Sequence, residues 1–174
     1  MDFVDLFEKG DFVQLGLDVE KKFKEIDNNK KIPRNKKYES KCREVIEKFY
    51  NRFDPIRESE NFFDLDAWDL NKLSFVVAVD FVARGLKMSQ VRKILNISIA
   101  IYRKSKEKDE DVLKEIGKLN YTLAYTLGRH KEIEPLAKVL GKVLPKIDSK
   151  EKYEKVHEFL QAVVAYHKLL GGRD

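Results

Sequence analysis

At residues 73–95 the chain reads LSFVVAVDFVARGLKMSQVRKIL, where a nearly all-apolar segment ends and a basic amphipathic segment begins. Only Ser74 and Asp80 interrupt the apolar run as far as Ala83. A helix that is apolar on all sides lies in the middle of a fold, so this run predicts the central helix of the domain. We expect Asp80 to pair with a nearby arginine or to lie at a subunit contact, because charged residues are rarely buried alone.

The segment from Gly85 to Ile94 combines the end of one helix with the start of the next. Gly85 suits the left-handed position that commonly follows a helix, and Ser89 is a suitable N-cap for the helix after it. Amides at a helix start, with cations beside them, favour a bound phosphate. A solvated polar turn is the alternative interpretation. The cations gathered here are Arg84, Lys87, Arg92 and Lys93.

The composition limits the class of protein. The chain has 174 residues, of which 43% are apolar and 37% charged, with few Gly and Pro, and this favours one mostly helical domain. No apolar run approaches the roughly 20 residues of a membrane span, and no signal peptide follows Met1. The single cysteine, Cys42, excludes an intramolecular disulfide and a cysteine-rich zinc site. We expect a cytoplasmic protein without cofactor or metal.

The net charge of +5 conceals a strong alternation along the chain. Residues 30–52 hold nine basic and three acidic residues, and residues 84–108 hold eight basic and one acidic. Residues 1–29 and 53–83 are acidic. Two basic blocks of this kind suggest a surface for a polyanion. A thermophile's surface, rich in Lys and Glu, is the competing interpretation.

The apolar periodicity predicts an all-α fold, a compact bundle of five main helices with an acidic N-terminal extension. Residues 1–37 form the extension and a basic loop, and residues 38–174 form the bundle. The extension is expected to supply one or two short helices that dock on the body or on a partner. Gly128 is expected to end one helix, and Asp148 with Glu151 to cap the last. The expected helices cover residues 38–53, 66–83, 89–106, 109–128, a shorter 133–143, and 148–170.

The helix over residues 89–106 carries two rows of cations. Arg92 and Arg103 are eleven residues apart, as are Lys93 and Lys104, and this spacing returns to nearly the same line on a helix. A rise of about 1.5 Å per residue separates each pair by about 16 Å, enough to span several phosphates of a nucleic acid strand. A solvated helix face would show the same pattern.

The sequence gives little support to catalysis. His130, His157 and His167 form no metal-binding or acid–base pattern, and the common catalytic motifs are absent. Helical ribonucleases of the HEPN type have an Arg followed by a His four to six residues later, and no Arg in this chain has that spacing. We therefore expect that the protein is not an enzyme.

Three stretches resemble the small helical subunit of type III-A CRISPR effector complexes, the Csm small subunit. They are GLKMSQVRKI at residues 85–94, LNYTLAYTLGR at 119–129 and FLQAVVAYHKLLGG at 159–172. Their order and spacing fit that family, and residues 1–60 carry no such resemblance. The resemblance implies a non-catalytic subunit that contacts the backbone of CRISPR RNA and target RNA. It also implies packing against other subunits of the effector complex and against copies of itself.

The resemblance places RNA contacts at Arg92, Lys93 and Arg129. Charge and helix geometry add a second set of candidate RNA contacts. These added candidates are Arg84, Lys87, Arg103, Lys36 and Lys37.

Three tyrosines, Tyr121, Tyr125 and Tyr166, are expected to pack in the core, with base stacking as the alternative.

Two other functions stay open. A protein-only adaptor would use the acidic N-terminal segment and apolar faces, and its basic helix would remain solvated. A ribonuclease would cleave single-stranded RNA without partners.

Overall fold

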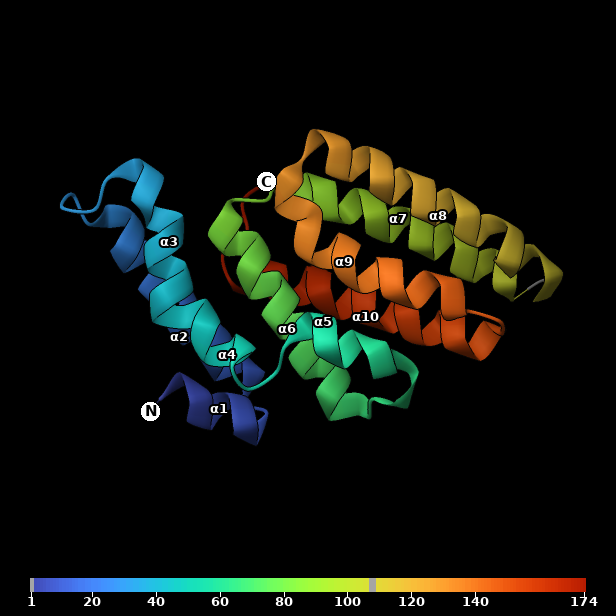
Figure 1. The fold of residues 1–174 in the computed structure, drawn as a ribbon, viewed down its shortest axis with the longest axis horizontal. Helices are drawn as coiled ribbons and strands as arrows, with labels where there is room; N and C mark the ends of the chain where they lie inside the picture. Colours follow the sequence, from blue (N-terminus) through green and yellow to red (C-terminus); the bar gives the residue numbers. More distant parts are fainter. Residues whose placement is uncertain (1, 107–108) are drawn as a thin grey trace.

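The computed structural model describes residues 2–106 and 109–174, with the side chains of all these except residues 109–111. The described residues form helices joined by short turns and loops, with no strand among them, and this confirms the all-α prediction (Figure 1). The helices are α1 (Phe3–Lys9), α2 (Phe12–Asn28), α3 (Lys37–Lys41), α4 (Glu47–Tyr50), α5 (Pro55–Glu58), α6 (Ala67–Arg84), α7 (Met88–Ser105), α8 (Asp109–Arg129), α9 (Glu134–Val143) and α10 (Lys150–Leu169).

Helix α6 lies at the centre of the molecule, as its sequence predicts. Every side chain from Leu73 to Phe81 is buried. The carboxylate of Asp66 accepts the Asp69 N–H at 2.8 Å and caps the start of the helix, and Gly85 ends it at φ 79°. Burial of a large apolar side chain contributes about 1.5–3 kcal/mol, so the buried run of α6 is a main source of stability, and α10 is the helix that packs on it most extensively.

The remaining long helices form successive layers beyond α6, in the order α10, α7 and α8. Helix α10 packs on both α6 and α7, and α7 packs on α8 (Figure 1). Lys93 of α7 lies over Tyr125 of α8, and Lys104 pairs with Glu115. Residues early in α7 therefore contact residues late in α8, and residues late in α7 contact residues early in α8, so the two helices are antiparallel. This arrangement brings the start of α7 beside the end of α8.

The N-terminal helices dock on the bundle and share its core. Helices α1 and α2 match the expected docking helices, although α2 is long, with 17 residues. The Phe12 ring lies 5.6 Å from Phe75 of α6, between ring centroids. At Gly16 the backbone of α2 touches Leu169 of α10 so closely that a Cβ would clash. Six buried residues of these two helices therefore belong to the same hydrophobic cluster as the bundle: Leu6, Phe7, Phe12, Leu15, Val19 and Phe23.

The helix predicted over residues 38–53 is present but ends at Tyr50, and a π-helical segment, Cys42–Ile46, lies between α3 and α4. Val45 and Phe49 of this segment, and Phe53 after it, are buried, whereas Tyr38 at its start is 37% exposed. Asp80 also behaves as expected, because its carboxylate pairs with Arg84 Nε at 2.8 Å.

The predicted cap at Ser89 is wrong, because α7 begins one residue earlier and its N-cap is Lys87. The Met88 N–H donates to the carbonyl of Arg173 at 2.7 Å. In addition, His167 Nε2 donates to the Leu86 carbonyl at 2.9 Å. The C-terminal segment therefore supports this helix start, and the Met88 amide is not available to a phosphate.

Two further boundaries differ from the prediction. The last helix is capped by Ser149, whose hydroxyl accepts the Lys152 N–H at 3.3 Å. Asp148, the expected cap, pairs instead with the Lys152 side chain at 3.0 Å. Helix α8 continues through Gly128 to Arg129, and the chain turns at His130. In both places two adjacent residues could mark the helix boundary, and the sequence pattern does not show which of them does.

Candidate nucleic-acid interface

Two of the predicted RNA contacts come from different helices and converge on one tyrosine. Lys93 Nζ lies 5.7 Å from the ring centroid of Tyr125. Arg129 NH1 donates a hydrogen bond to the Tyr125 hydroxyl at 2.9 Å, and its guanidinium carbon lies 5.8 Å from the ring centroid. All three residues are exposed. The antiparallel packing of α7 and α8 therefore joins the two family-like motifs into one surface.

These two cations lie apart from negative charge. Among the side chains that the structure describes, none forms an ion pair with Lys93 or with Arg129. Each lies against an aromatic ring instead, and a cation–π contact at an exposed site contributes only about 0.5–1 kcal/mol. Their charge is therefore directed to the solvent and is available to a bound anion.

The prediction that all three tyrosines pack in the core is wrong for Tyr121 and Tyr125. These two are 63% and 57% exposed. Tyr166 does pack, with its ring centroid 5.4 Å from that of Phe75 and its hydroxyl donating to Asn71 Oδ1 at 2.6 Å. We define the basic face by its four residues: Lys93, Tyr121, Tyr125 and Arg129.

The outward direction of the two tyrosines is encoded in the sequence. Leu119 and Leu123 of α8 are buried. Tyr121 comes two positions after Leu119, and Tyr125 comes two positions after Leu123. Two positions correspond to about 200° around a helix, which is nearly the opposite side. Sequence reasoning missed this feature, although the apolar periodicity contains the signal.

The other cations of α7 lie on its exposed side. Lys87, Arg92 and Arg103 are all exposed. Arg92 NH1 lies 4.0 Å from a carboxylate oxygen of Asp174, which is the outer limit of an ion pair. Lys104 pairs with Glu115 at 3.2 Å, and this carboxylate also binds Lys118. Among the described side chains Arg103 has no ion pair and Arg92 has only the long one to Asp174, whereas the charge of Lys104 is compensated.

Arg84 occupies a different environment from the other candidates. Its Nε contacts Asp80 at 2.8 Å and its NH1 contacts Glu134 of α9 at 3.4 Å. The guanidinium carbon lies 5.3 Å from the ring centroid of Tyr38. Burial opposes its charge, but the hydrogen bond and ion pair with Asp80 outweigh burial and raise the pKa of Arg84. Both carboxylates already neutralise this residue.

Asp80 is also held by two tyrosine hydroxyls, which makes this cluster a structural centre. Tyr38 donates at 3.0 Å and Tyr50 at 2.8 Å. Burial, with the nearby negative charge of Asp80, raises the pKa of both phenols, so they remain donors at neutral pH. The cluster thus connects α3 and α4 to α6 and, through Arg84, to α9.

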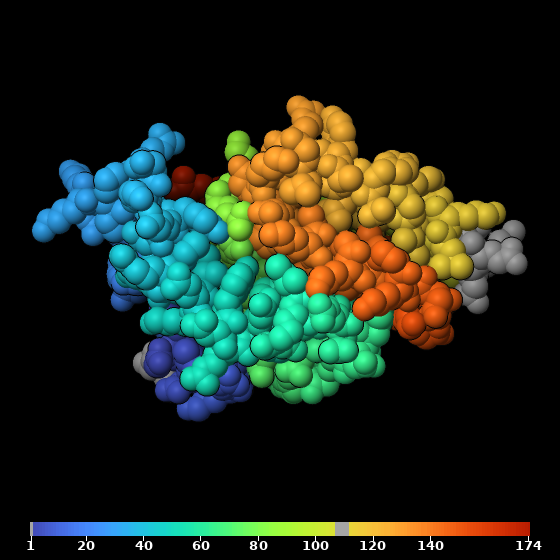
Figure 2. Space-filling model, in the orientation of Figure 1, coloured from blue at the N-terminus to red at the C-terminus, as the bar shows by residue number. Residues whose placement is uncertain are grey.

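Lys36 and Lys37 lie in another part of the molecule. They follow the loop between α2 and α3, in the segment that projects at the left of Figures 1 and 2. Lys36 pairs with Glu39 at 2.8 Å, and Lys37 donates to the backbone carbonyl of Asp27. Neither residue joins the basic face.

The buried histidines take part in packing. Ser98 Oγ lies 2.8 Å from His157 Nδ1 and 2.9 Å from the Tyr153 hydroxyl. Tyr102 stacks on the His157 ring at a centroid distance of 4.6 Å. Burial lowers the pKa of His157, and it raises the pKa of Tyr153 to about 12. The Ser98–His157 pair has the residue types of a nucleophile and its base, but both residues are buried.

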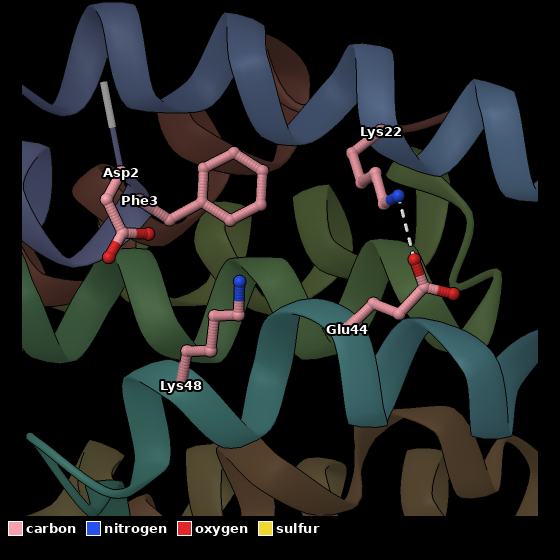
Figure 3. A pocket seen from close by; sticks show the side chains of 5 residues that line it. All are labelled: Asp2, Phe3, Lys22, Glu44 and Lys48. Carbon is pink, nitrogen blue, oxygen red and sulfur yellow. Dashed lines mark ion pairs between the residues drawn. The ribbon is translucent and has the colours of Figure 1, made fainter.

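An open cleft lies between the first helices and α3–α4, away from the basic face (Figure 3). Its lysines are already engaged, since Lys22 pairs with Glu44 at 2.7 Å and Lys48 lies 5.3 Å from the ring centroid of Phe3. Across residues 2–106 and 109–174, no cluster of three or more potential metal ligands is found. Within the same ranges no helix has the length and apolarity that crossing a bilayer requires.

Comparison with known proteins covers the part of the chain that carries the basic face. The family model for Csm2 Type III-A matches residues 64–173, which hold α6 to α10. The chain belongs to the Csm2 Type III-A family. CRISPR system Cms protein Csm2 of Streptococcus thermophilus is 31% identical over 93 residues, which are 51% of this chain and 76% of that relative. The resemblance to the type III-A small subunit is therefore confirmed.

Proposed function

We propose that this Csm2-family chain is a non-catalytic small subunit of a type III-A CRISPR effector complex that binds the backbone of CRISPR RNA and target RNA. The observation that carries this proposal is the convergence of Lys93 and Arg129 from two helices onto an exposed surface. Arg92, Lys87 and Arg103 extend that surface. Arg84 is left out of the RNA contacts, because Asp80 and Glu134 compensate its charge.

The binding chemistry is electrostatic and independent of sequence. Each phosphate that a lysine or arginine neutralises releases condensed counterions, so affinity falls steeply as salt rises. Contacts to phosphate position a protein on a nucleic acid without reading its bases. Base pairing between guide and target supplies the sequence specificity, and the protein supplies shape and charge.

The N-terminal part supports a role in assembly. Val13 and Leu17, one turn apart on α2, and Trp68 at the start of α6 are exposed large apolar residues. Exposed apolar residues are common at protein contacts. We place contacts with the other effector subunits and with further copies of the chain on this side, which leaves the basic face to the RNA.

The absence of catalysis is part of the proposal. The Ser98, His157 and Tyr153 hydrogen bonds join α7 to α10 inside the fold, where an RNA strand has no access. Incubation of pure protein with single-stranded RNA should leave the RNA intact over a full time course. Cleavage that follows the protein through purification would contradict this part of the proposal.

The test of RNA binding is a double charge reversal, Lys93→Glu with Arg129→Glu. We expect the loss of about two phosphate contacts, which lowers the slope of log affinity against log salt by about 2. The matched control is Lys9→Glu with Lys21→Glu, two exposed lysines of α1 and α2, which changes net charge by the same amount. Equal affinity and slope for the two variants would favour the protein-only adaptor.

A further inference from the structure

Tyr121 and Tyr125 form an exposed aromatic pair on neighbouring turns of α8. Four residues correspond to about 6 Å along a helix axis, and the two side chains are 63% and 57% exposed. One turn before Tyr121 stands Gly117, where a Cβ would meet no described atom within 4 Å apart from its chain neighbours and the backbone of its own helix. The outer side of the pair is therefore open along the helix.

The neighbouring cations hold one ring in position. The hydrogen bond from Arg129 fixes the Tyr125 hydroxyl at 2.9 Å, and Lys93 approaches the same ring from α7. Tyr50 and Tyr153, by contrast, use their hydroxyls to bind Asp80 and Ser98 inside the fold. Exposed aromatic rings flanked by free cations are the combination that single-stranded nucleic acids require, with stacking for the bases and positive charge for the phosphates.

We propose that Tyr121 and Tyr125 are a stacking platform for unpaired nucleobases, and this inference rests on the proposed RNA-binding function. Bases inside a duplex stack on their neighbours, so only unpaired nucleotides can offer a face to the tyrosines. Because every base has such a face, the platform has little sequence preference. Lys93 and Arg129 bind the phosphates that flank the stacked base. The basic face therefore distinguishes an unpaired stretch of RNA from a continuous duplex.

The experiment compares two strands of equal length and equal charge, oligouridylate and an abasic ribose–phosphate polymer. Wild-type full-length chain should bind oligouridylate roughly tenfold more tightly than the abasic strand, because stacking strengthens binding at each stacked base. The Tyr121→Ala, Tyr125→Ala double variant should bind both strands with nearly equal affinity and an unchanged salt slope. The Tyr121→Phe, Tyr125→Phe variant should keep the preference, because the rings remain.

Two controls show whether the preference for oligouridylate comes from these two rings. Leu113→Ala removes a large apolar side chain of the same helix that is 54% exposed but lies outside the basic face, and should keep the preference. Thermal melting of each variant should match wild type, because the changed side chains are exposed.

The outcomes distinguish this inference from the proposed function. Equal binding of both strands by wild type, with a steep salt slope, overturns the platform and leaves RNA binding in place. A preference that survives in the double alanine variant also overturns it. Binding of neither strand, or binding that the Lys93→Glu, Arg129→Glu variant does not reduce, overturns both.

Discussion

In the part of the chain that the structure describes, two arginine–tyrosine pairs have similar geometry and different surroundings. The guanidinium carbon of Arg84 lies 5.3 Å from the Tyr38 ring centroid, and that of Arg129 lies 5.8 Å from the Tyr125 centroid. The Arg84 side chain is 26% exposed and contacts two carboxylates. Arg129, by contrast, is exposed and donates a hydrogen bond to the Tyr125 hydroxyl. The same pair of residue types serves internal cohesion in one place and a solvent-facing surface in the other.

The difference shows that the number of cations in a segment does not locate an anion site. Arg84 stands in the most basic stretch of the sequence, yet Asp80 and Glu134 already neutralise it. Charge that is available to RNA lies where two helices bring cations together without carboxylates. We therefore place the proposed RNA site on the outer side of α7 and α8 and not at the helix junction near Ser89.

The largest effect is expected from Arg84→Met. This substitution leaves Asp80 buried without its cation, and breaking a buried ion pair costs about 3 kcal/mol or more of folding free energy. Denaturant unfolding measures the loss. Arg129→Met should change the free energy of unfolding by less than about 0.5 kcal/mol, as is usual at the surface. Equal losses in the two variants would remove the distinction between the two pairs.

A smaller effect, on RNA affinity, is expected from Arg129→Gln. The loss of one phosphate contact should weaken binding to every sequence by a similar factor and lower the salt slope by about 1. Fluorescence anisotropy with labelled RNA at several salt concentrations gives both values. Arg57→Gln serves as the control, because Arg57 is exposed but pairs with Glu58 at 2.9 Å. If Arg57→Gln weakened RNA binding as much as Arg129→Gln, net charge alone would explain the effect.

The two tyrosines should differ when they lose only a hydroxyl. Tyr38→Phe removes a hydrogen bond to the Asp80 carboxylate and should cost about 1.5 kcal/mol of stability. Tyr125→Phe removes a hydrogen bond at the surface and should leave the free energy of unfolding nearly unchanged. Chemical unfolding of both variants in one buffer makes the comparison, and a larger loss for Tyr125→Phe would contradict the roles assigned to the two pairs.

The smallest effect is a dependence on pH that comes from the buried interior and not from the basic face. Burial lowers the pKa of His157 and His167. As pH falls through about 6.5, the unfolded chain takes up protons on these residues before the folded chain does. Stability should therefore begin to decrease near about pH 7 and continue to decrease below about pH 6.5, until the lowered pKa values of the folded chain are reached. Replacing His157 and His167 with Gln should flatten this dependence, whereas Tyr121→Ala should leave it intact.

The fold could be predicted from the sequence wherever local rules decide it. The apolar run of α6 and the left-handed Gly85 depend on neighbouring residues, and both were predicted. The start of α7 was misplaced because its support comes from Arg173, which is remote in sequence. The close contact of Gly16 with Leu169 is likewise a tertiary fact that periodicity does not contain.

The site could be predicted in part. The motifs that hold Lys93 and Arg129 were identified, but their convergence on Tyr125 depends on the antiparallel packing of α7 and α8. A partner for Asp80 was expected, and Arg84 is four residues away on the same helix. The charge of Arg84 is also neutralised by Glu134, which comes from another helix, and the sequence did not predict this second pairing.

The central claim is that RNA contacts the outer side of α7 and α8. Ultraviolet crosslinking of the full-length chain to single-stranded RNA that contains 4-thiouridine, followed by mass spectrometry of the peptides, tests it directly. We predict crosslinks at Tyr121 and Tyr125, and their loss in the Lys93→Glu, Arg129→Glu variant. Crosslinks confined to residues 30–41, with none on α7 or α8, would contradict the claim.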